Sequence, residues 1–389
     1  MDINNKVQKS NISHCKVLTL APSFPKYSEV WMERMNDMLQ PEHLFVALSS
    51  TEIPEDYKNN SFSLSPQANL PNKVHMTLFG YTIRQQLTKL LEAIPADAVI
   101  LCHYLTTAVY MWDVLKKCKQ TVFVHCHGHD VTWERKVEKM PFLPAHGLLY
   151  KHNAKKMIGR VKLIANSQCT KQKLLDIGFK ENYIFINYLS VDTNELKPLN
   201  KKKSDFVRFL YLGRLTDFKG PIETIKAFEI ACENGLEGRL DVVGSGALMK
   251  MCLKLRDKSK YKVRIYIHGS ADRKQVLKFL SDADVLTAHN KRSLKTNQEE
   301  AFGVSVIEAM AMGLPVVTGK SGGVIETVVH NKTGLLFTPG DISEHANYLL
   351  TLAGDYEKRI EMGFQGRLRA IDLFDSRADE KELKNILGI

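Results

Sequence analysis

The sequence predicts an α/β fold of two similar halves, each with a parallel sheet covered by helices. Three observations lead to this prediction. The chain has 389 residues, a length that ordinarily divides into two domains. Hydrophobic residues make up 44% of the chain, which is enough to fill two cores. Short apolar runs alternate with amphipathic stretches, and this alternation occurs in both halves.

Each half is expected to contribute six strands. The strands predicted in the first half lie near residues 17–21, 44–48, 98–103, 121–125, 162–166 and 183–187, with helices such as 29–39 and 83–93 between them. Those predicted in the second half lie near residues 206–212, 239–243, 263–268, 283–288, 315–318 and 334–337. Residues 196–205 contain a proline, three consecutive lysines and no hydrophobic period, which is typical of a linker. The predicted domains are residues 1–195 and 206–370, followed by a C-terminal helix within residues 371–389.

Charge, apolar stretches and cysteine content exclude some classes of protein but do not identify the function. The chain has 54 basic and 43 acidic residues, a net charge of +11, which is compatible with an anionic partner. It lacks an apolar stretch of about 18 residues, and the apolar run near the N-terminus is too short for a signal peptide, so we expect a cytoplasmic protein. The seven cysteines are scattered and form no C-x-x-C pair, which argues against a disulfide framework and a zinc site. No zinc-finger spacing or RNA-recognition motif predicts a nucleic-acid partner.

The most informative segment is EEAFGVSVIEAMAMGLPVV, residues 299–317, in which two glutamates lie eight positions apart. Gly303 allows a tight loop to lead into a helix, whose first free N–H groups, at Val304 and Ser305, favour a phosphate. Glu300, just before that helix, is placed to accept hydrogen bonds from sugar hydroxyls. Glu308, about a turn and a half into the helix, is placed to reach a ribose diol. The segment therefore indicates a nucleotide-sugar site.

A purely structural reading of the two glutamates also exists. Glu300 would then be an acidic residue near a helix N-terminus, and Glu308 a solvated position of an amphipathic helix. Glu308, however, interrupts the otherwise apolar residues 304–312, where an unpartnered carboxylate would be costly. A bound ribose would supply the partner.

The second informative segment is YLGRLTDFKG, residues 211–220, where a predicted strand ends and a helix begins at about Pro221. Arg214 can hold phosphate oxygens with its planar fork, and Lys219 adds a compact positive charge. Both could simply be surface residues, but cations oppose the dipole at a helix start unless an anion is present. We therefore predict that the two residues face a diphosphate.

In the first half, the segment VHCHGHD, residues 124–130, ends a predicted strand with alternating histidines. On an extended strand, His125, His127 and His129 would share one face, so a metal site deserves consideration. Gly128 is expected to bend the backbone there. Alternatively, the histidines lie in the core or at the edge of the sheet and have no catalytic or metal-binding role.

These motifs resemble those of glycosyltransferase family 4, retaining enzymes of the GT-B fold. The family signature of a Glu, seven residues, a second Glu, an Ala-rich helix and Gly-x-Pro-Val is matched from Glu300 to Val317. The pattern Gly-Arg-Leu-x-x-x-Lys-Gly is matched from Gly213 to Gly220, and the resemblance is nearly continuous from Val207 to Asp341. It implies two Rossmann-like domains facing a cleft, the first for an acceptor and the second for a nucleotide sugar, with the last helix crossing back to the first domain.

The resemblance also implies roles for individual residues. Arg214 and Lys219 would stabilise the departing diphosphate, Glu300 would hold the donor sugar and Glu308 the ribose. His127 would contact the reacting sugar, and Asp130 would orient its loop. Further nucleotide-sugar contacts are expected from Phe302, Gly303, Val304, Ser305, Gly269 and Ser270. Ser28 and Glu29 match a Phe-Pro-x-x-Ser-Glu loop found in a subset of the family, which faces the donor phosphates and the acceptor.

The function implied is retaining transfer of a hexose-type sugar from a UDP- or GDP-sugar to an acceptor hydroxyl. The acceptor would be a glycan or a lipid-linked oligosaccharide of cell-surface polysaccharide synthesis, and neither a cofactor nor a metal is expected. A nucleotide-sugar epimerase and a non-catalytic scaffold are the alternatives. Between residues 133 and 162, basic residues outnumber acidic ones and interleave with apolar ones. This stretch either lies peripherally on an anionic membrane surface or forms a solvated face.

Overall fold

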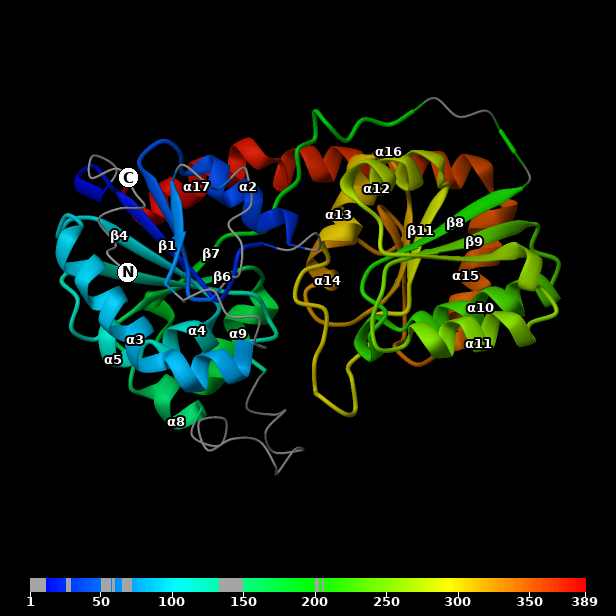
Figure 1. Cartoon of the computed structure of the whole chain (residues 1–389). Helices are drawn as coiled ribbons and strands as arrows, with labels where there is room; N and C mark the ends of the chain where they lie inside the picture. Colours follow the sequence, from blue (N-terminus) through cyan, green and yellow to red (C-terminus); the bar gives the residue numbers. More distant parts are fainter. Residues whose placement is uncertain are drawn as a thin grey trace. The chain divides into compact units, whose positions relative to one another are not determined.

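The computed structural model describes residues 12–25, 29–49, 57, 60–64, 72–132, 150–199, 203–204 and 206–389, with only the backbone of residues 62 and 72–79. The chain divides into two compact units. Unit 1 consists of Met1–Asn187 and Glu380–Ile389, and unit 2 of Tyr188–Asp379 (Figure 1).

The boundary between the units comes before the predicted linker at residues 196–205, because the preceding residues stay with unit 2. The N–H of Val191 donates to the carbonyl of Phe374 at 2.9 Å. The guanidinium of Arg367 donates to the carbonyls of Thr193, at 2.7 Å, and Leu196. These hydrogen bonds hold residues 191–196 against helix α16 (Tyr356–Leu373) and the residue that follows it.

Unit 1 contains one parallel sheet with the strand order β3-β2-β1-β4-β5-β6-β7. Its strands are β1 (Val17–Ala21), β2 (His43–Ala47), β3 (Ser61–Ser63), β4 (Val99–His103), β5 (Thr121–Cys126), β6 (Lys162–Ala165) and β7 (Ile184–Ile186). The six predicted strands are all present. β3 is an additional strand, which the apolar pattern missed because its sequence is only Ser-Phe-Ser.

Among its described residues, unit 1 has the helices α2 (Val30–Met38), α3 (Asn72–Ala93), α4 (Leu105–Tyr110), α5 (Trp112–Leu115), α8 (Tyr150–Lys155) and α9 (Gln168–Ile177). β1 and β4 are buried along their whole length, as expected for parallel strands covered on both faces. Helix α17 (Ser376–Leu387) completes the cover. Its Leu383 and Leu387 pack with residues of unit 1 such as Met35 and Phe123, and Figure 1 shows α17 next to α2.

Unit 2 contains a second parallel sheet with the strand order β10-β9-β8-β11-β12-β13. Its strands are β8 (Val207–Leu212), β9 (Gly238–Val243), β10 (Ile265–Gly269), β11 (Val285–Ala288), β12 (Val316–Gly319) and β13 (Gly334–Phe337). All six were predicted. Besides α16, its helices are α10 (Pro221–Glu233), α11 (Met249–Lys258), α12 (Arg273–Asp282), α13 (Val304–Ala311), α14 (Val324–Thr327) and α15 (Ile342–Gly354). Figure 1 shows α10 and α11 on one side of the sheet and α12, α13 and α16 on the other.

The strand order places a switch point in each sheet. In unit 2 the chain runs from β8 outward to β9 and β10, then returns to the other side of β8 with β11. In unit 1 the same reversal occurs between β1 and β4. In open parallel sheets, ligands bind outside the carboxyl ends of the strands at such a point. The prediction of two Rossmann-like units is thereby confirmed, and the loops after β8 and β11 become the first place to look for a site. None of the helices in the described parts of the chain is long and apolar enough to span a bilayer.

Candidate active site

The loop after β8 carries Arg214 and Lys219, and it is shaped by glycine. Gly220 has a φ of 59° and forms the N-cap of α10, with Pro221 as the first helical residue. A Cβ at Gly220 would lie 2.1 Å from the carbonyl oxygen of His289, which follows β11. Only glycine therefore permits this close approach of the loops after β8 and β11, on either side of the switch point.

The close approach brings together Lys219 and Glu300, two residues that the sequence assigned to separate motifs. Their side chains form an ion pair and are only 15% and 10% exposed. Burial by itself raises the pKa of Glu300. The charges of Lys219 and Arg214 and the hydrogen bonds from Lys219 and the N–H of Phe302 outweigh it, so the pKa lies below its ordinary value. Glu300 is thus a carboxylate at neutral pH, held beside a cation.

The loop that carries Glu300 is fixed by the loop after β12. The N–H of Gly323 donates to the carbonyl of Glu300 at 2.8 Å. A Cβ at Gly323 would lie 1.9 Å from the carbonyl oxygen of Ala301. Gly303, with a φ of 93°, then forms the N-cap of α13, so that Val304 and Ser305 open the helix as the sequence predicts.

Phe302 anchors the same loop from inside. Its ring is 1% exposed and stacks on Tyr188, with ring centroids 5.6 Å apart, while Phe374 meets it edge-on at 5.4 Å. Any contact of Phe302 with a ligand would therefore use its backbone.

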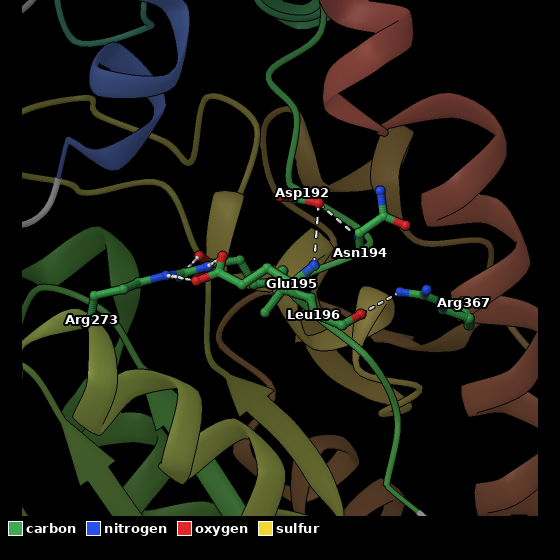
Figure 2. A network of polar contacts seen from close by, with 7 residues as sticks. Asp192, Asn194, Glu195, Leu196, Arg273 and Arg367 are labelled. Atoms are coloured by element: carbon green, nitrogen blue, oxygen red, sulfur yellow. Dashed lines mark hydrogen bonds and ion pairs between the residues drawn. The ribbon is translucent and has the colours of Figure 1, made fainter. Parts of the chain in front are cut away.

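Glu308 has a partner that the sequence did not suggest. Arg273, the first residue of α12, donates from Nη1 to Oε1 of Glu308 at 2.6 Å. Its Nη2 donates to Oε2 of Glu195 at 2.5 Å, and Figure 2 shows how this pair joins the segment from Asp192 to Leu196. Burial lowers the pKa of Arg273, but the two carboxylates more than offset this, so the net pKa is raised. Arg273 therefore fixes the carboxylate that was predicted to hold a ribose.

A sequence pattern could have predicted that Arg273 lies in the site. Asp272 and Gln275 form a capping box: the carboxylate of Asp272 accepts from the N–H of Gln275, and the side chain of Gln275 accepts from the N–H of Asp272. This pattern places Arg273 in the first helical turn after the loop of Gly269 and Ser270. There, a cation opposes the helix dipole and requires anionic partners.

Gly269 and Ser270 connect the loops after β9 and β10. The carbonyl of Gly269 accepts from the N–H of Gly244 at 2.7 Å, and the hydroxyl of Ser270 donates to that of Ser245 at 2.8 Å. Ser270 is exposed. Gly269 and Ser270, predicted as nucleotide-sugar contacts, thus lie in loops at the carboxyl edge of the sheet that also carries Arg214.

Unit 1 gathers histidines at the carboxyl ends of β4 and β5. His103 lies opposite His125 in the register of the two strands, and Nδ1 of His103 lies 3.3 Å from Nε2 of His127. Burial lowers the pKa of His103 to about 3. Burial, together with neighbouring histidines, holds the pKa values of His125 and His127 well below the ordinary value. The three imidazoles are therefore neutral at physiological pH.

The expected bend at Gly128 is present, and it separates His129 from His125 and His127. β5 ends at Cys126, and Gly128, with a φ of 92°, turns the chain so that His129 is exposed. His103 takes the third position instead. A lone histidine at the end of β4 carried no spacing signal in the sequence, because only the pairing of β4 with β5 brings it to the other two.

Asp130 ties the loop after β5 to the start of α4. Its Oδ1 accepts from the N–H of His127 at 2.9 Å and its Oδ2 from the N–H of Leu105 at 2.8 Å. Burial raises the pKa of Asp130 in spite of these hydrogen bonds. Because it binds the backbone of His127, Asp130 sets the position of that residue.

The face of His127 is covered by an aromatic ring. The indole of Trp31 lies on the imidazole of His127 with ring centroids 4.0 Å apart. Glu29, from the predicted acceptor loop, accepts from the hydroxyl of Tyr104 at 2.9 Å. Ser28 lies outside the described residues. Trp31 and Tyr104 were not predicted as site residues. Trp31 lies in a helix and Tyr104 in a loop, and neither belongs to a sequence motif.

Comparison with known proteins identifies the part of the chain around the Lys219–Glu300 pair. Residues 192–369 match the model of a family described as "Glycosyl transferases group 1". This segment is similar to the group 1 glycosyl transferases. The resemblance drawn from the sequence motifs is thereby confirmed, and the matched segment contains Arg214, Lys219, Glu300 and Glu308.

Individual relatives agree with the family. The chain is 28% identical over 228 residues to a Staphylococcus aureus protein named "Capsular polysaccharide biosynthesis glycosyltransferase CapM", covering 58% of each. It is 23% identical over 276 residues to "Amylovoran biosynthesis glycosyltransferase AmsK" of Erwinia amylovora, covering 70% of this chain and 64% of the relative. The alignments thus span less than two thirds of the length of these relatives.

The fold has close counterparts among solved structures. The crystal structure of Anabaena Alr3699/HepE in complex with UDP and glucose aligns with a TM-score of 0.76 at 19% identity, covering 96% of this chain and all of that one. At this identity the likeness concerns the fold. The predicted GT-B fold class is confirmed.

Proposed function

We propose that the protein is a retaining glycosyltransferase that moves a hexose-type sugar from a UDP- or GDP-sugar to an acceptor hydroxyl. The observation that carries this proposal is the buried ion pair of Lys219 with Glu300, beside Arg214 at the switch point of unit 2. The acceptor would be a glycan or lipid-linked oligosaccharide of cell-surface polysaccharide synthesis. The names of CapM and AmsK, and the UDP and glucose in the HepE complex, support this direction.

The proposed chemistry depends mainly on charge. Negative charge grows on the departing diphosphate, and Lys219, Arg214 and the first N–H groups of α13 would stabilise it. In a front-face mechanism the diphosphate itself accepts the proton of the attacking hydroxyl, so neither a protein base nor a metal ion is needed. Glu300, paired with Lys219, is placed to orient the sugar through its hydroxyls.

The remaining contacts follow from the same assignment. Glu308, steadied by Arg273, would accept hydrogen bonds from the ribose. His127, positioned through its N–H by Asp130, would contact the reacting sugar or the acceptor. The ammonium of Lys219 would bind a phosphate oxygen while it stays paired with Glu300. The ion pair would thus hold the ammonium near the leaving group before and after transfer.

The donor is expected to stabilise the protein selectively. A thermal-shift panel with UDP, GDP, ADP and their common sugars should give one responsive nucleotide, since a ligand that binds only the native state raises its stability by RT ln(1 + [L]/Kd). At a donor concentration of about 100 times Kd, this amounts to about 2.7 kcal/mol. Arg214→Ala should lose most of the shift, and EDTA should leave it unchanged.

Turnover separates the proposal from its alternatives. Release of nucleoside diphosphate that depends on an added acceptor supports transfer. Conversion of the donor to an epimer without acceptor would identify an epimerase, and binding without any turnover would identify a scaffold. A folded sample that responds to no nucleotide would overturn the proposed donor site.

We also propose that the basic stretch of unit 1 touches an anionic membrane surface through charge alone. In its described part, Tyr150, Ala154 and Met157 are buried in the core, whereas Lys155 and Lys156 are exposed. Reversal of both lysines to glutamate should weaken sedimentation with phosphatidylserine liposomes, because each basic residue near such a surface contributes about 1 kcal/mol.

The matched control for the liposome experiment is Lys250→Glu with Lys254→Glu. These two lysines are exposed on α11 of unit 2, and their reversal changes the net charge equally. Equal liposome binding by the two double variants and the parent chain would refute the membrane contact.

A further inference from the structure

The histidine cluster of unit 1 has the composition of a metal site. We propose that His103, His125 and His127 together bind one divalent transition-metal ion of the Zn²⁺ type. From the sequence, His129 was the third candidate ligand, but the family resemblance and the expected bend at Gly128 argued against a metal. In the structure His129 is exposed. The structure replaces it with His103.

The geometry supports a shared ion. One ring nitrogen from each of the three histidines lies within 4.8 Å of the other two. Nδ1 of His103 and Nε2 of His127 are 3.3 Å apart. A tetrahedral zinc ion with bonds of about 2.0–2.1 Å places neighbouring nitrogens about 3.3 Å apart. One pair thus already has the required spacing, and rotation of the His125 ring would bring in the third nitrogen.

The ring nitrogens of this cluster also need a partner. His125 is fully buried, and neither of its ring nitrogens has a hydrogen-bond partner among the described residues. Nδ1 of His127 has none there either. Buried polar atoms without partners cost free energy, and coordination of an ion would offset that cost.

The ligand set indicates the class of ion. Three imidazole ligands suit Zn²⁺, Ni²⁺, Co²⁺ and Cu²⁺ rather than Mg²⁺ or Ca²⁺, which prefer oxygen ligands. Cys102 and Cys126 are adjacent in sequence to His103 and to His125 and His127, but successive side chains of a strand point to opposite faces.

Metal binding would compete with the role proposed for His127. If His127 contacts the reacting sugar, an ion held by its ring would exclude the sugar, and zinc would inhibit transfer while EDTA would not. This consequence rests on the proposed function, whereas the binding of the ion does not.

The decisive experiment measures the metal alone. The full chain, stripped with EDTA and kept reduced, is titrated with Co²⁺ and followed by the visible absorption of tetrahedral cobalt, then competed with Zn²⁺. We expect one equivalent of zinc to remain after dialysis. His125→Ala and His103→Ala should each weaken binding about 100-fold or more, since even outer-shell changes cost about 10–100-fold. His129→Ala, which alters an exposed neighbour, should bind as the parent chain does.

Several outcomes would overturn the site. These are loss of all zinc on dialysis of the parent chain, zinc stoichiometry unchanged in both alanine variants, and a strong near-ultraviolet thiolate band in the cobalt complex. His103→Gln covers the case in which an alanine variant does not fold, because it keeps a polar side chain but loses the imidazole. The readout contains no nucleotide, so its failure is distinct from failure of the proposed transfer.

Discussion

Lys219→Ala is expected to lower kcat for sugar transfer about 100- to 1,000-fold, the effect seen when one donor to a developing negative charge is removed. Lys219 is the cation paired with Glu300, and its loss removes charge stabilisation from the departing diphosphate. The loss also leaves Glu300 buried with less positive charge nearby, so its pKa should rise. Steady-state kinetics with the donor found in the thermal-shift panel provides the measurement.

Lys171→Ala is the matched control for this variant. Lys171 is 20% exposed and pairs with Glu181 at 2.7 Å, but it lies in unit 1, on α9. It should retain the parent kcat. Since removing one partner of a buried ion pair destabilises a protein by about 3–5 kcal/mol, Lys219→Arg is needed as well, because it keeps the charge. A kcat for Lys219→Ala within about threefold of the parent value, far from the loss expected for a charge-stabilising donor, would exclude Lys219 from leaving-group stabilisation.

Gly323→Ala is expected to destabilise the protein by about 1–3 kcal/mol, the usual cost of forcing an extra methyl into a packed site. The φ of Gly323 is −72°, an ordinary value, so the effect is purely steric. The new Cβ would lie 1.9 Å from the carbonyl oxygen of Ala301 and push away the loop that carries Glu300. The donor-induced thermal shift should fall with it. Urea unfolding with and without donor measures both effects.

Gly354→Ala is the comparison, because the Cβ it would add at the end of α15 points into open space among the described residues, apart from the backbone of the helix itself. It should be neutral or stabilise the protein by up to about 1 kcal/mol, from the higher helix propensity of alanine. Equal stability of the two variants would show that the loop after β12 does not support the Glu300 loop.

Much of the fold and several site positions were predictable from sequence alone. Burial on both faces makes each parallel strand a short apolar run, so all twelve predicted strands are present. The motifs around Arg214, Lys219, Glu300 and Glu308 were predictable as well, since each lies within a few residues of a glycine that ends a strand or opens a helix. Hydrophobic periodicity and turn-forming residues are local properties of the sequence, because each depends only on residues close together along the chain.

The partners of these residues were decided only by the tertiary structure. Pairing of β4 with β5 adds His103 to the cluster and leaves out His129. The path of the chain at the start of α12 places Arg273 in an ion pair with Glu308. From the sequence, a bound ribose was the only partner suggested for Glu308. Strand order and the close approach at Gly220 join Lys219 to Glu300. Contacts between distant segments depend on which strands lie side by side, and no local pattern encodes that order.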